Sequence, residues 1–168
     1  MARPERSRLE VWKQFLRAHR QLTGVLGAEL ERERGLPLGW YEVLLHLANA
    51  PDNRLRMGDL ADAAMLSPSG LTRLVDRMVD AGLVARDPCP SDRRVLYTLL
   101  TPAGRATLRR AAPTHLRDID EHFARVLTDE EVAVMTRAFA RVLDALSDDD
   151  VADGVSGRRP SPSWRRSS

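Results

Sequence analysis

The sequence predicts a mainly α-helical protein with one small β-ribbon near the middle of the chain. Three observations support this fold class. Apolar residues recur at helical spacing toward both ends of the chain. A helix-start signature, a hydroxyl residue followed by proline, occurs at Ser67-Pro68 and again at Thr101-Pro102. Between these two starts lie two strand-like segments, joined by a loop that contains two prolines.

The composition is that of a soluble globular protein, with 43% hydrophobic and 30% charged residues among 168. The formal charge of +2 does not by itself indicate a nucleic-acid partner. The single cysteine, Cys89, excludes an intramolecular disulfide, and no apolar run approaches the length of a membrane span. These features favour a reducing cytoplasm. The sequence contains no P-loop, nucleophile elbow or dinucleotide glycine pattern, so neither an enzyme nor a cofactor is expected.

The first part of the chain predicts two helices that follow a flexible leader (residues 1–8). Apolar residues at helical spacing extend from Leu9 to about Arg34, where Gly35-Leu36-Pro37 ends the first helix. The second helix spans roughly Gly39 to Ala48. A turn that contains Pro51 follows.

Residues 51–101 carry the sharpest local signals. A short helix from Gly58 to Ala64 precedes a second helix, which Ser67 caps and Gly82 ends. Two strands, Leu83–Asp87 and Arg94–Leu100, then form the ribbon. Leu55 is expected to pair with the ribbon as a short strand. The buried face of the second helix is expected to consist of Leu71, Leu74, Val75 and Met78.

The last part of the chain predicts two more helices and a tail. A long helix starts at Thr101 and runs to about Val126, and Pro113 within it should kink or break it. Thr128-Asp129-Glu130-Glu131 is a capping box that starts a last helix, which reaches Leu146. Residues 147–168 are rich in Asp, Gly, Pro, Ser and Arg, which predicts a disordered tail.

The order helix, turn, helix, ribbon over residues 51–101 is that of a winged helix-turn-helix, a device that places one helix in a DNA groove. Seven Arg and seven Asp cancel between Pro51 and Thr101, so any basic surface must come from placement. Arg73 and Arg77 project from the same side of the second helix. Their guanidinium groups match guanine O6 and N7, or a phosphate. The alternative is that neighbouring aspartates, such as Asp76, pair with these arginines.

The predicted ribbon carries Asp92-Arg93-Arg94 where the chain returns from the tip. A thin loop that carries arginine can enter the minor groove, where narrow A·T tracts have the most negative potential. Asp92 could hold Arg94 in place through an ion pair. The alternative is a polar hairpin turn without any role in binding.

Several of these segments together resemble the MarR family of winged-helix regulators. The matching parts are Asp59-Leu60-Ala61, LTRLVDRMVDAGLV from Leu71 to Val84, the Asp92-Arg93-Arg94 wing, and YTLLTPAG from Tyr97 to Gly104. The resemblance extends from about Leu9 to Leu146. The parts occur in the family's order with tight spacing, which makes the pattern specific.

The resemblance implies a homodimer in which residues 9–50 and 102–146 form a helical dimerisation region. Two winged units would then bind double-stranded DNA at a pseudo-palindromic operator, with half-sites ~34–36 Å apart. Such a dimer usually represses a promoter by occluding it. The residues expected to contact or frame the DNA are Arg56, Ser67, Ser69, Gly70, Thr72, Arg73, Arg77, Asp92, Arg93 and Arg94.

Members of the family often bind a small phenolic or anionic aromatic effector in a crevice between the dimerising and DNA-reading parts. By position, the residues expected to line such a crevice here are Trp12, Phe15, His19, Trp40 and His46. Core packing of the aromatic residues is the alternative. It is the more common role for aromatic residues at helical spacing.

Three further readings stay open. Arg86, Arg93 and Arg94 near Cys89 could lower the pKa of its thiol, which would suit a redox-sensing regulator. His115, Asp118 and His122 share a helix face and could bind zinc, but without a supporting motif a solvated polar face is favoured and no metal is expected. A winged helix can also serve protein contacts alone, without reading DNA.

Overall fold

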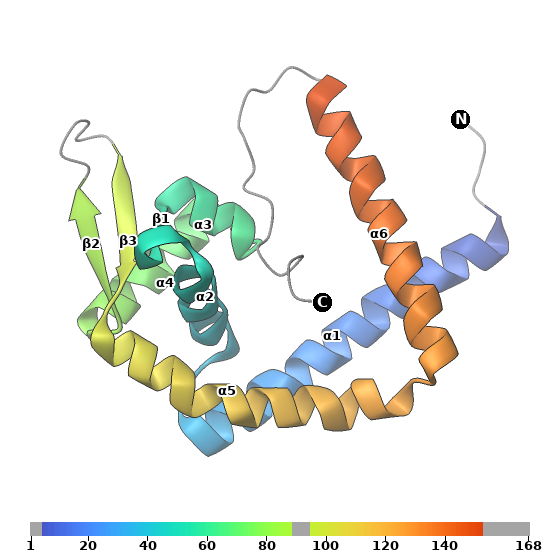
Figure 1. The fold of residues 1–168 in the computed structure, drawn as a ribbon, viewed down its shortest axis with the longest axis horizontal. Coiled ribbons are helices and arrows are strands. Elements are labelled where there is room, and N and C mark those ends of the chain that lie inside the picture. The colour runs from blue at the N-terminus through green and yellow to red at the C-terminus, as the bar shows by residue number, and fades with distance from the viewer. Residues whose placement is uncertain (1–4, 89–94, 153–168) are drawn as a thin grey trace. The chain divides into compact units, whose positions relative to one another are not determined.

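The computed structural model describes residues 5–88 and 95–152 of the 168-residue chain (Figure 1). The chain divides into two compact units, Met1–Ile119 and Asp120–Ser168, and each is considered by itself. The elements in chain order are α1 (Arg6–Arg34), α2 (Leu38–Asn49), η1 (Pro51–Asn53), β1 (Arg54–Arg56), α3 (Met57–Ala63), α4 (Pro68–Asp80), β2 (Val84–Pro88), β3 (Leu96–Leu100), α5 (Pro102–His122), η2 (Ala124–Val126) and α6 (Asp129–Ala152). The predicted fold class, mainly α with a small β-wing, is confirmed.

Helix α1 is long, and only its C-terminal part is buried. It begins at Arg6, within the predicted leader, and ends at Gly35, whose positive φ of 62° closes the helix as a left-handed cap. The N–H of Gly35 donates to the carbonyl of Glu31 at 2.8 Å. Leu26 and Leu30 are buried, whereas every residue from 11 to 20 is exposed. The burial of α1 is therefore concentrated in its C-terminal part.

The helix-turn-helix forms where the sequence predicts it. The α3–α4 turn passes through Met65, which takes a positive φ of 53°. The Oγ of Ser67 accepts from the N–H of Gly70 at 3.1 Å, so the predicted cap of α4 is confirmed. At the other end Gly82 has a φ of 70°, and the N–H of Leu83 donates to the carbonyl of Met78 at 2.9 Å. These are the bonds of a Schellman motif, which confirms the predicted stop.

The three strands form one antiparallel sheet in the order β1-β3-β2. Leu55 pairs with Thr98, so the predicted short strand is present. Strand β2 begins at Val84 rather than at Leu83, because the N–H of Leu83 is used in the α4 cap. One sheet face, which includes Val84, Thr98 and Leu100, is buried against the helices. The opposite face carries side chains from the alternate positions.

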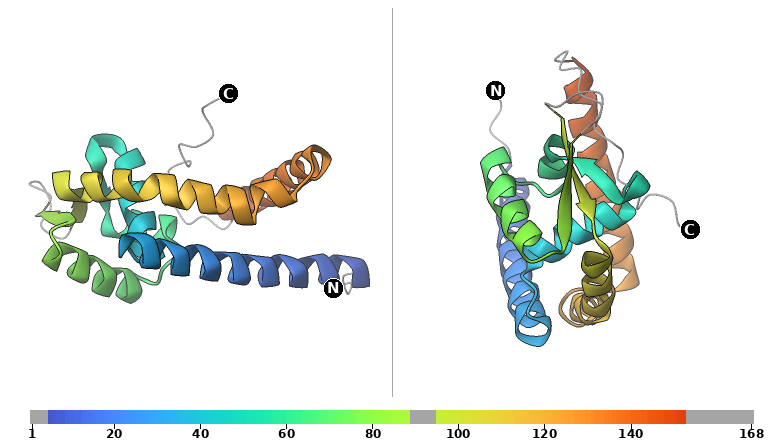
Figure 2. Two further views of the ribbon diagram at one scale, coloured as in Figure 1. Left: turned by 90° about the horizontal axis from the view of Figure 1, so that it is seen from below. Right: turned by 90° about the vertical axis from the view of Figure 1, so that its left-hand side faces the viewer.

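One hydrophobic core holds the winged unit together. It draws on α2, α3, α4, the sheet, the end of α1 and the first half of α5 (Figure 2). Its fully buried side chains include Leu44, Leu47, Leu60, Leu71, Val75 and Met78. Leu74 is only partly buried against this cluster, so its predicted place on the buried stripe is at the margin of the core.

Helix α5 is continuous from Pro102 to His122 and contains Pro113. The prediction that this proline breaks the helix is wrong. Pro113 is exposed, and the removed N–H would have bonded to the carbonyl of Arg109, which is also an exposed residue. Buried neighbours on the opposite side, among them Ala111 and Thr114, hold the helix on the core. The helix also ends earlier than predicted, and the 3₁₀ turn η2 follows it.

Within the second unit, the capping box at the start of α6 is confirmed. The N–H of Thr128 donates to the Oε2 of Glu131 at 2.8 Å, and the N–H of Glu131 donates to the Oγ1 of Thr128 at 3.3 Å. The bond from the Thr128 backbone lowers the pKa of Glu131. Helix α6 continues to Ala152, so the tail predicted from Ser147 is wrong for its first residues. Residues 129–153 contain no glycine or proline that would stop the helix before Gly154. Residues 153–168 lie outside the described part of the chain.

None of the described helices combines the length and the hydropathy that crossing a lipid bilayer requires.

Candidate nucleic-acid interface

The exposed face of α4 is the centre of the candidate interface. Leu71, Val75 and Met78 anchor the helix in the core, and this leaves Arg73 and Arg77 exposed on the other side. Arg73 and Arg77 are one helical turn apart, so both guanidinium groups can reach the same groove. The amphipathic pattern of the sequence therefore places these two arginines as predicted.

Both arginine side chains are exposed, and none of the described residues pairs with them. In the part of the chain that the structure describes, no hydrogen bond or ion pair engages either guanidinium. Asp76, which could have neutralised Arg73, instead pairs with Arg86 of β2 through its Oδ1. Asp87 pairs with Arg54 at 3.3 Å. The net charge of the winged unit is zero, but these aspartates are taken up by arginines outside α4.

The first turn of α4 carries the predicted hydroxyl groups. Ser67 and Ser69 are exposed, and Gly70 is partly buried. A Cβ placed on Gly70 would lie only 3.0 Å from the Oγ of Ser67. The hydroxyl of Thr72 donates to the carbonyl of Pro68 at 2.8 Å. Thr72 therefore keeps an acceptor and its methyl group for an outside contact. A helix N-terminus with exposed hydroxyl groups favours an anion such as a phosphate.

Arg56 lies at the junction of β1 and α3 and is also exposed. Its Nε donates to the hydroxyl of Tyr97 at 3.3 Å, and its guanidinium carbon lies 5.9 Å from the centroid of the Tyr97 ring. Arg54 lies over the same ring at 5.0 Å. Sequence reasoning missed Tyr97. The strand register, which pairs Arg56 with Tyr97 across β1 and β3, is the signal that could have found it.

The predicted wing residues Asp92, Arg93 and Arg94 lie outside the described residues, as does Cys89. Strand β2 ends at Pro88, before this segment, and strand β3 begins at Leu96, after it.

The five residues proposed for an effector crevice fall into two groups. The exposed half of α1 carries a row of three rings, from Trp12, Phe15 and His19. The ring centroids of Trp12 and Phe15 are 5.8 Å apart, and those of Phe15 and His19 are 6.2 Å apart. On α2, Trp40 packs against the core and His46 is half-buried, which lowers the pKa of His46. Burial raises the pKa of Glu42 on α2, and the electrostatic effect of His19 on α1 opposes this shift.

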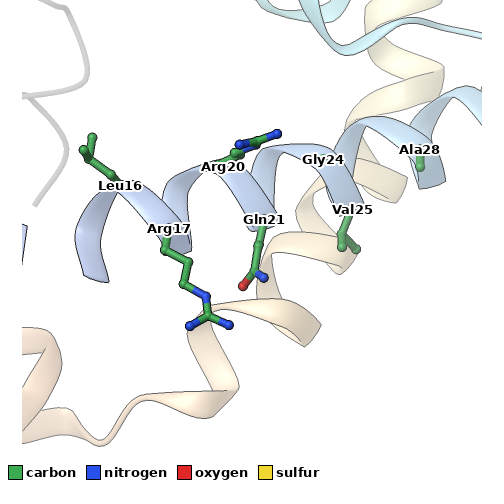
Figure 3. A pocket seen from close by; sticks show the side chains of 7 residues that line it. All are labelled: Leu16, Arg17, Arg20, Gln21, Gly24, Val25 and Ala28. Carbon is green, nitrogen blue, oxygen red and sulfur yellow. The ribbon is translucent and has the colours of Figure 1, made fainter. Parts of the chain in front are cut away.

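A hollow of about 890 Å³ lies along α1 and contains none of these five residues (Figure 3). Its lining side chains come from a single helix face: Leu16, Arg17, Arg20, Gln21, Gly24, Val25 and Ala28. Within the described residues, the aromatic row and the hollow are therefore separate features of α1.

A polar network joins the end of α1 to α5. Arg117 bonds to Glu33 at 2.9 Å and to Asp118 at 2.6 Å, and Asp118 is only 1% exposed. The bond from Arg117 lowers the pKa of Glu33. Arg34 bonds to the buried Thr114 at 2.6 Å. The interpretation of this α5 face as solvated and polar is thus wrong for Asp118, because its side chain is buried and is bonded to Arg117.

The zinc alternative finds no support in the described residues, where no group of three potential metal ligands occurs. His115 instead packs against Tyr41 in a tilted arrangement, with the two ring centroids 4.5 Å apart and 54° between the ring planes. Burial in this position lowers the pKa of His115, and the charge of Asp118 opposes the shift. His115 is therefore a core-edge residue next to the polar network.

A capped helix with two exposed arginines, set beside a three-stranded sheet, defines a winged helix-turn-helix protein. Residues 34–95 match the model of the MarR family. The chain is 35% identical over 115 residues to the HTH-type transcriptional repressor Mb2911 of Mycobacterium bovis, a match that spans 68% of this chain and 78% of that protein. It is 32% identical over 101 residues to the HTH-type transcriptional regulator MhqR of Bacillus subtilis, which covers 60% of this chain and 66% of MhqR.

Solved structures of MarR family regulators have the same fold as this chain. AbsC, a MarR family transcriptional regulator from Streptomyces coelicolor, matches with a TM-score of 0.77 and 34% identity, over 88% of this chain and 99% of AbsC. Sco3205 from the same organism, solved in complex with DNA, matches with a TM-score of 0.77 and 33% identity, over 86% of this chain and 94% of Sco3205. The chain belongs to the MarR family of DNA-binding transcriptional regulators.

Proposed function

We propose that the chain is a homodimeric repressor that binds a pseudo-palindromic operator and leaves it when a small anionic aromatic compound binds. The observation that carries this proposal is the exposed pair Arg73 and Arg77, which no described acidic residue neutralises. In this proposal both arginines read the major groove. The phosphates are contacted by Ser67, Ser69, Thr72 and Arg56. The minor groove is contacted by Arg93 and Arg94, and Asp92 holds Arg94 in place.

Exposed apolar side chains support the homodimer. On α1 these are Val11, Trp12, Phe15 and Leu16, with exposures of 71%, 55%, 40% and 46%. Helix α6, in the other unit, exposes Val132, Val134, Phe139, Val142, Leu143 and Leu146. Apolar groups of this number and size on one chain mark an interaction surface. A second copy of the chain is the proposed partner, because a two-fold dimer presents two α4 helices to a palindromic site.

The effector part of the proposal rests on the row Trp12, Phe15 and His19, where aromatic rings and an imidazole offer stacking and a hydrogen bond. The proposed effector carries an aromatic ring and an anionic group. Salicylate is a suitable probe: quenching of tryptophan fluorescence on titration, lost in Trp12→Phe, supports the assignment. Unchanged fluorescence together with unchanged DNA affinity would remove the effector from the proposal.

The proposed activity is occlusion of a promoter by binding, not catalysis, and it takes place in the cytoplasm, where bacterial DNA lies. The relatives that support this inference are transcriptional regulators.

The test is DNA binding by the full chain. Duplexes selected by the wild-type protein from a random pool define its operator, and fluorescence anisotropy then measures affinity. Arg73→Ala combined with Arg77→Ala should weaken binding by at least ~30-fold, from two lost contacts of about 1–3 kcal/mol each. The matched control, Arg109→Ala with Arg110→Ala, removes the same charge from exposed positions of α5. Equal losses in both double variants would show that general charge, rather than the α4 face, holds the DNA.

A further inference from the structure

The turn that ends α4 and the turn that begins α5 are bonded to each other through one side chain. The hydroxyl of Thr101 lies 2.8 Å from the carbonyl oxygen of Gly82 and 2.9 Å from that of Leu83. The same oxygen accepts from the N–H of Gly104 at 3.0 Å. Thr101 thus does two things at once, because its hydroxyl hydrogen bonds to the end of the α4 cap while its oxygen caps α5.

The backbone of α5 also approaches this turn without any side chain between. Gly104 is buried, and a Cβ placed on it would lie 2.0 Å from the carbonyl oxygen of Leu83. The N–H of Thr101 donates to that same carbonyl at 3.3 Å. Only glycine leaves the space for this approach. Figure 1 shows the start of α5 beside the turn between α4 and β2.

A second tie holds the first turns of α5 on another side. Arg105 donates from Nη2 to the Oδ1 of Asn53 in η1, just before β1. Beyond these ties, Leu108 and Ala111 of α5 lie in the core of the winged unit. The start of α5 is therefore bonded to the end of α4 at one edge and to η1, which directly precedes β1, at another.

We propose that Thr101 is a positioning residue for DNA binding, which, with Gly104, locks the C-terminal end of α4 to the first turn of α5. The inference rests on the proposed homodimer, in which the dimerisation helices set the separation of the two α4 helices. A rigid attachment passes that separation to the DNA, so that only one half-site spacing fits both copies. A loose attachment would let each winged unit adjust to other spacings.

Three substitutions separate the two roles of the hydroxyl group. Thr101→Ser keeps both the cap and the bond to the α4 turn. Thr101→Asp keeps a good helix cap but has no hydrogen to donate to Gly82 or Leu83. Thr101→Val keeps the shape and loses both bonds. Thr107→Asp adds the same charge to α5 at a residue whose only described side-chain bond is to Arg110, and so controls for charge.

The experiment compares the selected operator with versions in which one or two base pairs are inserted between the half-sites. One inserted pair rotates the half-sites by roughly 35°, so the wild type should lose about tenfold or more in affinity. Thr101→Ser and Thr107→Asp should keep this discrimination. Thr101→Asp should reduce it to less than about threefold, and its affinity for an isolated half-site should stay within about twofold of the wild type.

Circular dichroism and light scattering confirm that each variant folds and dimerises. If Thr101→Val does not fold, the Asp and Ser variants still decide the matter. A Thr101→Asp protein with wild-type spacing discrimination would show that the hydroxyl only caps α5, which overturns the proposal. Loss of discrimination in Thr101→Ser would overturn it as well. A wild-type protein that selects no DNA refutes the proposed function itself, and this outcome is visible before any Thr101 variant is made.

Discussion

The winged unit and the first half of α1 differ in how they satisfy their apolar side chains. In the winged unit, Leu60, Leu71, Val75 and Met78 are fully buried by neighbours from the same chain. In α1, residues 11–20 are all exposed, although Trp12 and Phe15 are as apolar as any core residue. The core of the winged unit is thus complete within one chain, whereas residues 11–20 of α1 keep their apolar side chains exposed. This difference separates folding from assembly and tells which substitutions should affect each.

The largest effect on folding should come from Gly104→Ala. Its new methyl group would meet the Leu83 carbonyl oxygen at 2.0 Å, and backbone on both sides must move to admit it. We expect a loss of about 3 kcal/mol in the free energy of unfolding, measured by urea denaturation. Gly58→Ala is the control, because nothing lies within 4 Å of the added group. A Gly104→Ala protein as stable as the wild type would disprove the close approach of α5.

The next effect should appear in assembly rather than in folding. Trp12→Ser combined with Phe15→Ser removes two large apolar groups from the exposed half of α1. The dimer should weaken by at least ~30-fold, or ~2 kcal/mol, as judged by light scattering over a range of concentrations. Helical content should stay close to that of the wild type.

The matched control is Met65→Ser, which removes an apolar side chain that is 87% exposed on the winged unit. It should leave the dimer intact. If both changes weaken the dimer equally, the contrast between the two regions does not describe the assembly.

A smaller effect, of opposite sign, is expected from Met65→Gly. Met65 is a non-glycine residue with a positive φ of 53°, which costs about 1 kcal/mol relative to glycine. Met65→Gly should therefore raise the unfolding free energy by up to ~1 kcal/mol. Met65→Ala keeps the Cβ and should show no such gain. An equal gain in both variants would point to the side chain rather than to the backbone.

The smallest effect concerns pH and the edge of the core. Burial lowers the pKa of His115 below its ordinary value, so the folded protein binds a proton there less readily than the unfolded chain. The stability that comes from neutral His115 should be complete above a pH of about 6.5 and should decline as the pH falls toward the lowered pKa. Melting temperatures between pH 8 and 5 should therefore fall less in His115→Gln than in the wild type. Parallel curves would exclude this contribution.

The sequence by itself determined the elements whose causes are local. Ser67-Pro68 starts α4 and Gly82 ends it, because a cap and a left-handed stop act within one helical turn. The capping box at Thr128 acts over the same range. The spacing of apolar residues likewise determined that Arg73 and Arg77 are exposed, since the opposite face of the helix is buried. The mostly helical fold with a small wing follows from these signals.

Only the tertiary structure decided how charges and close contacts are shared between distant segments. Arg86 rather than Arg73 takes Asp76, and Tyr97 lies against Arg54 and Arg56, because strands from far along the chain meet in one sheet. Pro113 stays within an unbroken helix, since the packing of α5 outweighs a missing hydrogen bond. The need for glycine at position 104 comes from the carbonyl of Leu83, which local sequence does not reveal. Such contacts depend on how the folded chain returns on itself, and residue spacing carries no record of that.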